Sequence, residues 1–437
     1  MASSAVLQVI GEPKNYKKAR YVYENQAREA LLAATAVADI TGGEAILLAP
    51  ESLVTSLESD RDEARKLLEK PEMLEQKVLE QLERMGENHP KPMVKILPSI
   101  GSFSQHEKGW RINAQGSFAV IEAALFLIMR KLVNEGKNIT MVVTSGLNIY
   151  PALALRTLNH ILTYQLLSNY PLDTNQTPQH KLAFHTIPTQ EKEEIQIETH
   201  TIETRVFNIF PLTIDEIDKE ICKLYQHEMR SNLRWHLSNG MRAFNCITRN
   251  TPLPLYYEKI INKIDPREIS FLEEKVAEDL KNRYKPEIHV VNNEILIKRP
   301  SELGLSLIRR AMMSLALTRV LMRLVDEARR EVDDDGWVPL EAIEKMFIDK
   351  IYDDKREFKL NKFLLESELY KIREGGGDVY GSSINGHRVG GSSNEKRNFF
   401  AHSGFLRDMT IVRKDGEKIL LKYCEEKMER VKGWLLD

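Results

Sequence analysis

The chain of 437 residues has few cysteines and no long apolar run. Its three cysteines, Cys222, Cys246 and Cys424, are scattered without the spacing of a metal site, which indicates a reducing compartment. The longest apolar run, Ala123–Met129, is too short to cross a membrane. Because no basic segment precedes the short apolar run that follows Met1, no signal peptide is visible, and we expect a cytoplasmic protein.

The sequence also lacks an excess of either charge. Its 62 lysines and arginines against 64 aspartates and glutamates give a formal net charge of −2, so any nucleic-acid site must be local. No Gly-x-Gly-x-x-Gly follows the first expected strand and no Walker lysine is present, so NAD- and ATP-dependent enzymes fit poorly. The length predicts two or three domains, and the hydrophobic content of 42% is typical of a globular protein.

The first half of the chain alternates strand patterns with helical patterns, which predicts a Rossmann-like, doubly wound parallel sheet. Residues 178–197 and 205–210 are expected to supply the last strands, and the alternation of Ile195, Ile197 and Thr199 favours an edge strand or a hairpin. The earlier strands are expected at Val6–Ile10, Ala45–Leu48, Val94–Leu97 and Ile139–Val143, with helices over residues 23–38, 60–85 and 118–133 and a loop over 98–109.

The loop after the fourth expected strand is a candidate binding site. In doubly wound sheets, ligands bind beyond the carboxyl ends of the strands, at the point where the strand order reverses. The segment Thr144-Ser145-Gly146-Leu147-Asn148 offers hydroxyls, a glycine and the start of a helix near Tyr150, a combination that favours a phosphate or a polar nucleotide group. An ordinary strand-to-helix turn capped by serine or asparagine explains the same spacing equally well.

The second half of the chain has mainly helical patterns. Thr213 is expected to cap a helix that opens a connector over residues 213–300, and Leu303–Val325 is an apolar helix of the core or of a dimer interface. Two hairpins are expected, one formed by Ile288–Val291 and Glu294–Ile297 and the other by Thr410–Arg413 and Lys418–Leu421. Asp333–Gly336 is expected to be a solvated turn without a metal. Residues 375–393 are rich in Gly and Ser, which indicates a flexible connector or a mobile flap.

The segment Arg397-Asn398-Phe399-Phe400-Ala401-His402 has the composition of a nuclease site. An imidazole exchanges a proton near pH 7, and a guanidinium matches the oxygens of a phosphate, which together suit RNA cleavage by its own 2′-hydroxyl without a metal. On an ideal helix Arg397 and His402 lie about 140° apart, so either Arg397 curls round or a second copy of the chain completes the site. A merely solvated surface helix is the alternative, and Arg230 and His236 form a second pair of similar spacing.

This segment, with Ser403 and Gly404, resembles the HEPN ribonuclease motif of CRISPR-associated CARF–HEPN enzymes. The strand that ends in Thr-x-Gly-x-Asn and the opening V-I-G-E-P-K-N-Y resemble the ligand loops of CARF domains, the Rossmann-like sensors of cyclic oligoadenylate. The resemblance implies catalytic roles for Arg397, Asn398 and His402. It also implies ligand contacts from Gly11, Glu12, Asn15, Tyr16, Thr144, Ser145, Gly146 and Asn148.

The resemblance further implies three regions: a CARF-like domain over residues 1–212, a helical connector with a hairpin over 213–300, and an α-helical HEPN domain over 301–437. It implies a homodimer, or an assembly of dimers, that cleaves single-stranded RNA when it binds cyclic oligoadenylate, the tetra-adenylate in particular, and that needs no cofactor. Two alternatives remain open from the sequence. One is a non-catalytic, ligand-responsive transcriptional regulator, and the other is an enzyme whose N-terminal domain degrades the cyclic nucleotide.

Overall fold

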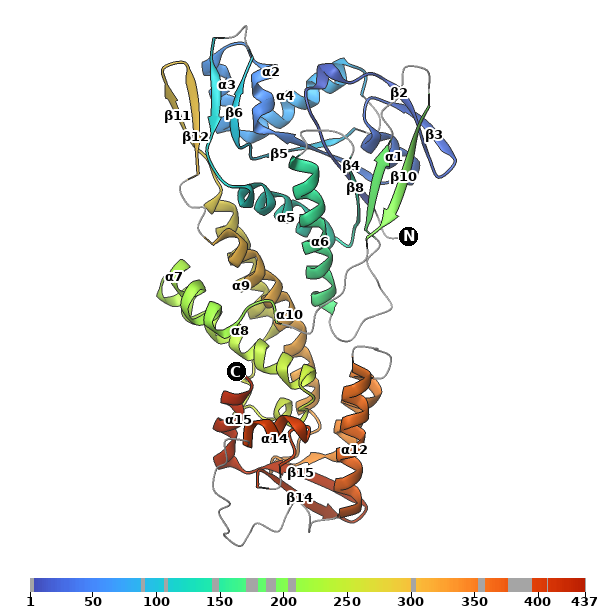
Figure 1. Ribbon diagram of the computed structural model, residues 1–437, viewed down its shortest axis with the longest axis vertical. Coiled ribbons are helices and arrows are strands. Elements are labelled where there is room, and N and C mark those ends of the chain that lie inside the picture. Colours follow the sequence, from blue (N-terminus) through green and yellow to red (C-terminus); the bar gives the residue numbers. More distant parts are fainter. Residues whose placement is uncertain are drawn as a thin grey trace. The chain divides into compact units, whose positions relative to one another are not determined.

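The computed structural model describes residues 4–87, 91–105, 109–143, 149–169, 180–185, 194–202, 210–299, 304–352, 358–375, 395–406 and 408–436 (Figure 1). The chain divides into two compact units. Unit 1 comprises Met1–Leu166, Thr177–Arg205 and Val276–Arg309, and unit 2 comprises Leu167–Gln176, Val206–Lys275 and Arg310–Asp437. None of the helices in the described ranges is both long enough and apolar enough to cross a membrane.

A mixed, mostly parallel sheet of eight strands forms the centre of unit 1. Five neighbouring strands are parallel: β9 (Lys181–His185), β8 (Asn138–Val142), β1 (Ser4–Val9), β4 (Glu44–Pro50) and β5 (Met93–Leu97). Helices α1 (Ala33–Thr41), α3 (Arg61–Glu69) and α4 (Pro71–Arg84) pack apolar side chains against one face, and α5 (Phe118–Asn134) contacts β5 and β8. The expected α/β fold and the four early strands are confirmed.

The order of the parallel strands places the carboxyl ends of β1 and β8 side by side. Strand β1 lies between β4 and β8, so the chain proceeds from β1 outward through β4 and β5 and then returns to β8 on the other side of β1. This is the point where the strand order reverses, at which such sheets bind ligands. The segments that follow β1 and β8 therefore leave the same edge of the sheet as neighbours.

The helix expected over residues 23–38 is wrong in its first part. Residues Ala19–Tyr23 and Gln26–Ala30 form the antiparallel strands β2 and β3, and a helix, α1, begins only at Ala33. Glu24 and Asn25 form the turn with φ of 47° and 64°, a conformation that asparagine tolerates better than most residues. Strand β2 pairs with β10 (Glu194–Thr201), a partner far along the chain that local helical spacing does not reveal.

Strand β10 confirms the alternation of Ile195 and Ile197, which are both buried. It is antiparallel to β9, as a hairpin requires, but it is not an edge strand, because β2 covers its other side. Of the two alternatives predicted from the sequence, the hairpin agrees with the antiparallel pairing and the edge strand does not, because the β2–β3 hairpin extends the sheet beyond β10. The strand expected over 205–210 lies outside the described residues except for Phe210.

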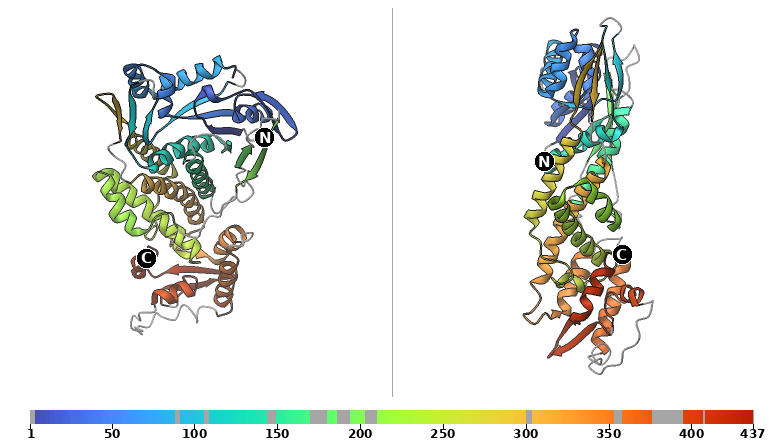
Figure 2. Two further views of the ribbon diagram at one scale, coloured as in Figure 1. Left: turned by 45° about the horizontal axis from the view of Figure 1, so that its top comes forward. Right: turned by 90° about the vertical axis from the view of Figure 1, so that its left-hand side faces the viewer.

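A second, four-stranded sheet joins two distant parts of the chain in unit 1 (Figure 2). The expected hairpin is confirmed as β11 (Glu287–Val291) and β12 (Glu294–Lys298), with Asn292 in the turn at φ 55°. Strand β12 pairs in parallel with β7 (Arg111–Ala114), which pairs with β6 (Gly101–Ser104) inside the segment that we expected to be a loop. Ile112, Ile295 and Ile297 are fully buried there, so side-chain burial across the two segments stabilises the pairing.

Unit 2 is largely helical. Its main helices are α8 (His227–Thr248), α12 (Lys359–Gly375), α14 (Glu395–Ala401) and α15 (Met428–Trp434), together with parts of α9 (Pro266–Arg283) and α10 (Leu305–Arg329). Helices α8 and α10 approach so closely that a Cβ at Gly240 would lie within 1.9 Å of the Thr318 hydroxyl oxygen. The buried Met312, Leu315 and Leu321 confirm that α10 belongs to the core.

Three local predictions for unit 2 are confirmed. Glu216 N–H donates to the Thr213 hydroxyl at 3.2 Å and Thr213 N–H donates to the Glu216 carboxylate at 2.9 Å, which is a reciprocal helix cap. The C-terminal hairpin consists of β14 (Thr410–Asp415) and β15 (Lys418–Tyr423). Asp333 accepts hydrogen bonds from the backbone of Asp335 and Trp337, as a turn does. Most of the Gly- and Ser-rich segment lies outside the described residues.

Candidate active site

Helix α14 presents the motif residues on one side. Arg397, Asn398 and His402 are exposed, whereas Phe399 is fully buried and packs against the Trp434 ring at a centroid distance of 5.3 Å. On an ideal helix the exposed positions span an arc of about 140°, and Phe399 lies outside that arc. The apolar pair in the middle of the motif therefore attaches the helix to the core and directs the polar residues outward.

The residues after His402 end the helix in a tight, buried turn. Ser403 and Gly404 have φ of 51° and 81°, and Gly404 N–H donates to the Phe399 carbonyl at 2.8 Å, which is a Schellman-type cap. A Cβ at Gly404 would lie 3.0 Å from the hydroxyl oxygen of Tyr423, which donates to the Gly404 carbonyl. Asn250 donates to the Ser403 hydroxyl at 2.8 Å. Only small residues fit after the histidine.

A buried carboxylate lies beside the histidine. The Nδ1 atom of His402 is 3.5 Å from Oε1 of Glu368 on α12, and the His402 side chain is half exposed. Glu368 is buried and also accepts a hydrogen bond from Lys371 at 2.6 Å. Sequence reasoning missed Glu368. The available signal was an acidic residue on the inward side of a helix, between Leu365 and Ile372, both fully buried.

The loop after β1 contains four of the expected ligand residues and brings two of them, Gly11 and Tyr16, into contact. Gly11 N–H donates to the Tyr16 hydroxyl at 2.8 Å, and a short 3-10 turn, Pro13–Asn15, closes the loop between them. The Glu12 carboxylate lies 3.1 Å from the Lys14 ammonium and is partly exposed, while Asn15 is exposed. The loop thus has a fixed backbone and polar groups available to a ligand at the reversal point of the sheet.

Two family models match the chain in the regions that contain these sites. Residues 5–182 match the CARF domain, and residues 284–426 match the HEPN domain, of the CRISPR system endoribonuclease Csx1. The chain belongs to the Csx1 family of CRISPR endoribonucleases. The resemblance drawn from the motifs is therefore confirmed. A comparison with curated proteins found no match.

Within the CARF region of this Csx1 family member, the second set of expected ligand residues cannot be located. Thr144, Ser145, Gly146 and Asn148 lie outside the described residues, although β8 before them and α6 (Ile149–Asn169) after them are described. Tyr150, in the first turn of α6, is buried, and its hydroxyl donates to the Pro98 carbonyl at 2.9 Å. The strand expected before this segment and the helix expected after it are both confirmed.

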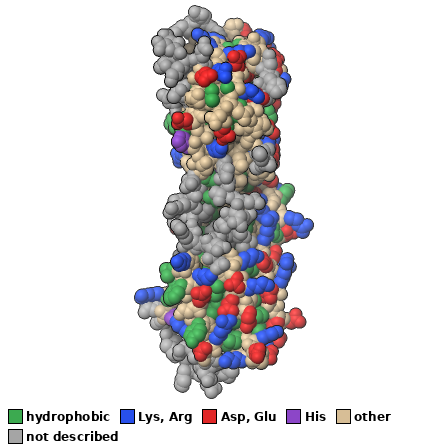
Figure 3. Space-filling view, turned by 90° about the vertical axis from the view of Figure 1, so that its right-hand side faces the viewer, with side chains coloured by type: hydrophobic (Ala, Val, Ile, Leu, Met, Phe, Trp, Pro, Cys, Tyr) green, Lys and Arg blue, Asp and Glu red, His purple; other side chains and the backbone are tan. Residues whose placement is uncertain are grey.

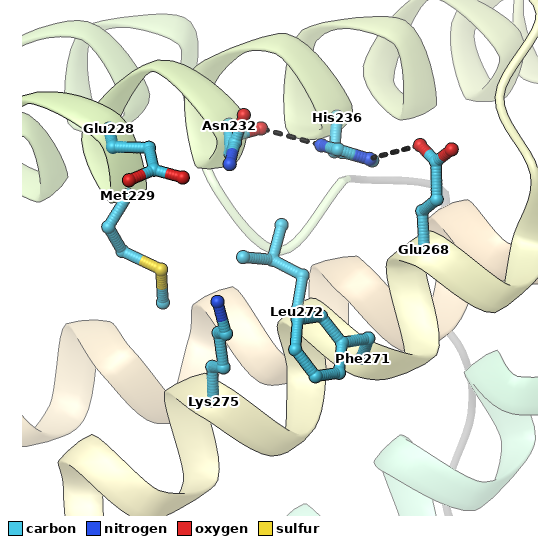
Figure 4. Close-up of a pocket in the computed structure, with 8 residues that line it drawn as sticks. All are labelled: Glu228, Met229, Asn232, His236, Glu268, Phe271, Leu272 and Lys275. Atoms are coloured by element: carbon cyan, nitrogen blue, oxygen red, sulfur yellow. Dashed lines mark hydrogen bonds and ion pairs between the residues drawn. The ribbon is translucent and has the colours of Figure 1, made fainter.

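The second arginine–histidine pair does not form a comparable site. His236 is buried in α8, where its Nδ1–H donates to the Asn232 carbonyl at 2.7 Å, and burial lowers its pKa. It lines a pocket of about 310 Å³ between α8 and α9, facing Glu268 at 3.9 Å (Figure 4). Arg230 is exposed and is not among the lining residues. Figure 4 also shows Phe271 and Leu272 as an apolar wall of this pocket.

The charges of the surface are mixed. On the face drawn in Figure 3, lysine and arginine side chains alternate with aspartate and glutamate, which agrees with the small net charge. The chain as a whole thus carries no excess of basic residues. In the described ranges, no group of three or more His, Cys, Asp or Glu side chains is arranged to hold a metal ion.

Proposed function

We propose that the protein is an endoribonuclease of type III CRISPR defence that cyclic oligoadenylate, the tetra-adenylate in particular, activates. The substrate is single-stranded RNA, and cleavage requires no metal. The observation that carries the proposal is the arrangement on α14, where Arg397, Asn398 and His402 are exposed together inside the region that matches a HEPN domain. Action on RNA of a CRISPR system supports a cytoplasmic location.

The proposed chemistry assigns one role to each residue. His402 exchanges the proton of the 2′-hydroxyl or of the leaving 5′-oxygen, and Arg397 stabilises the charge that develops on the phosphorane. Asn398 orients the phosphate or the motif itself. Attack by the adjacent 2′-oxygen on phosphorus breaks the bond to the 5′-oxygen, so the products are a 2′,3′-cyclic phosphate and a 5′-hydroxyl. Glu368, which lies 3.5 Å from Nδ1, supports this role because it can hold the Nδ1 proton and leave Nε2 facing the RNA.

The proposed ligand site combines the two loops at the reversal point of the sheet. Gly11, Glu12, Asn15 and Tyr16 follow β1, and Thr144, Ser145, Gly146 and Asn148 follow the adjacent strand β8. Backbone N–H groups and hydroxyls of this kind bind phosphate and nucleotide groups. We divide the chain into a CARF domain over 1–212, a connector over 213–300 and a HEPN domain over 301–437, and two copies pair so that both motifs contribute to one composite site.

Cleavage of RNA in EDTA tests the proposal. The full-length protein and its His402→Ala variant are compared with and without cyclic tetra-adenylate, and the product ends are identified by their reaction with phosphatase and kinase. We expect ligand-dependent cleavage that leaves a 2′,3′-cyclic phosphate in the wild type and a loss of at least about 100-fold in the variant, the usual contribution of a general acid or base. Activity that EDTA abolishes and Mg²⁺ restores would contradict the mechanism.

A further inference from the structure

A second guanidinium lies against the motif helix. Arg249 ends α8, and its Cζ atom is 5.1 Å from the centre of the Phe400 ring. Phe400 follows Arg397 by three positions, so it is the neighbour of Arg397 on the helix surface, on the side away from His402. Arg249, Arg397 and His402 therefore succeed one another around α14.

The position of Arg249 is fixed by contacts on both sides of it. The next residue, Asn250, has φ of 55° and donates to the buried Ser403 hydroxyl directly after the motif. Before Arg249, the side-chain amide of Asn361 lies 3.3 Å from the Ile247 carbonyl oxygen and 3.2 Å from that of Thr248. These bonds attach the end of α8 to both α14 and α12. The Arg249 guanidinium is therefore held in a defined position beside the motif, although the two lie far apart in the sequence.

Within the described part of the chain, no acceptor occupies the N–H donors of the Arg249 side chain. Among the residues that the structure describes, the Arg249 guanidinium makes neither a hydrogen bond nor an ion pair, whereas Arg234 pairs with Asp218 and Arg430 pairs with Glu395. The carbonyl end of α8 favours a positive charge at this position without a carboxylate partner. A guanidinium that stacks by its face keeps the N–H groups of its edge free for a phosphate.

We propose that Arg249 binds the RNA phosphate next to the scissile one, on the Arg397 side. The inference rests on the proposed function, because it assumes that Arg397 binds the scissile phosphate. Arg249 then contributes to the binding of the RNA and to the choice of the phosphate that is cleaved. His402 still carries out the proton transfers. Phe400 serves as the platform that orients the guanidinium.

RNA binding at several salt concentrations tests this role. A fully 2′-O-methylated RNA, which has no free 2′-hydroxyl to attack, is titrated with full-length wild type, Arg249→Gln and Arg249→Lys in EDTA. The control is Arg413→Gln, because Arg413 also stacks on an aromatic ring, Trp337 at 4.4 Å, but has Asp333 as a partner at 3.9 Å. One lost phosphate contact on single-stranded RNA should reduce the slope of log Kd against log salt by about 0.7.

We expect Arg249→Gln to show this shallower slope and, with cleavable RNA, a KM raised about tenfold with kcat largely retained, since a charge-assisted contact to phosphate is lost. Arg249→Lys should keep the slope of the wild type, and so should Arg413→Gln. An unchanged slope and KM in Arg249→Gln, with active wild type, would overturn the inference alone. Wild type that neither binds nor cleaves RNA would overturn the proposed function. A lowered melting temperature with an unchanged slope would assign Arg249 a structural role only.

Discussion

At the scale of single residues, the role proposed for His402 depends on which ring nitrogen faces the RNA. A carboxylate at Nδ1 holds the proton there and leaves the Nε2 lone pair free, and it also stabilises the positive charge that forms when Nε2 takes up a proton. Glu368 lies in this position and is itself buried, so little water competes for its charge. Glu368 therefore acts on His402 in two ways: it orients the imidazole ring, and its negative charge stabilises the protonated ring.

We therefore expect Glu368→Gln to lower kcat by roughly tenfold, a part of the 100- to 10,000-fold that general acid–base catalysis contributes. KM should change little, because the amide retains the shape of the carboxylate. The control is Glu366→Gln, an exposed residue of the same helix, which should leave kcat unchanged. Single-turnover cleavage at saturating protein measures the rate of the bond-cleaving step directly. Equal rates in the Glu368→Gln variant and the wild type would exclude a role for this carboxylate in presenting His402.

At the scale of elements, most helices and strands could be predicted from local patterns, whereas pairings between distant segments could not. The β2–β3 hairpin was mistaken for a helix because its stability comes from pairing with β10 and from burial of Tyr21 and Tyr23. Strand β6 was missed for the same reason, since its sheet is completed by β11 and β12. The contiguous motif around His402 could be found, but tertiary packing alone places Glu368 and Arg249 beside it.

A buried histidine that links β8 to α6 in unit 1 predicts that the stability of the fold depends on pH. His180 is fully buried; its Nδ1 accepts from Ile139 N–H of β8 at 2.9 Å, so its Nε2–H donates to Gln165 of α6 at 2.8 Å. Burial lowers the pKa of His180 from 6.5 to about 4. The unfolded chain therefore binds a proton below pH 6.5 that the folded chain does not bind until about pH 4. Stability from this group is complete above pH 6.5 and decreases by roughly 3 kcal/mol as the pH falls through that window.

The variant His180→Asn should reduce this slope, because asparagine can still accept from Ile139 N–H but does not titrate. Urea midpoints at pH 7.5, 6 and 5 measure the effect, and His289→Asn, at a half-exposed position of β11, is the control that should follow the wild type. The variant will also be less stable at pH 7.5, which does not affect the slope. A decrease with falling pH as steep as that of the wild type would show that other groups cause the acid sensitivity.

At the scale of the whole molecule, the angle between the two motif residues favours pairing of two chains. Arg397 and His402 of one α14 point about 140° apart, so one chain alone does not direct both side chains at one phosphate unless Arg397 curls back. A two-fold axis near α14 would place the Arg397 of one copy opposite the His402 of the other, and symmetry would repeat the arrangement. A site shared in this way can be tested without a structure of the dimer.

Mixing two inactive variants provides that test. Arg397→Ala and His402→Ala, each at least about 100-fold impaired alone, are combined after subunit exchange in the presence of cyclic tetra-adenylate. Random pairing makes about half of the dimers mixed, and each mixed dimer holds one intact pair of two, so recovery should approach roughly a quarter of wild-type activity. Exchange is monitored independently by a fluorescent label on each variant. Complete exchange without recovery would contradict an active site formed by the Arg397 of one copy and the His402 of the other.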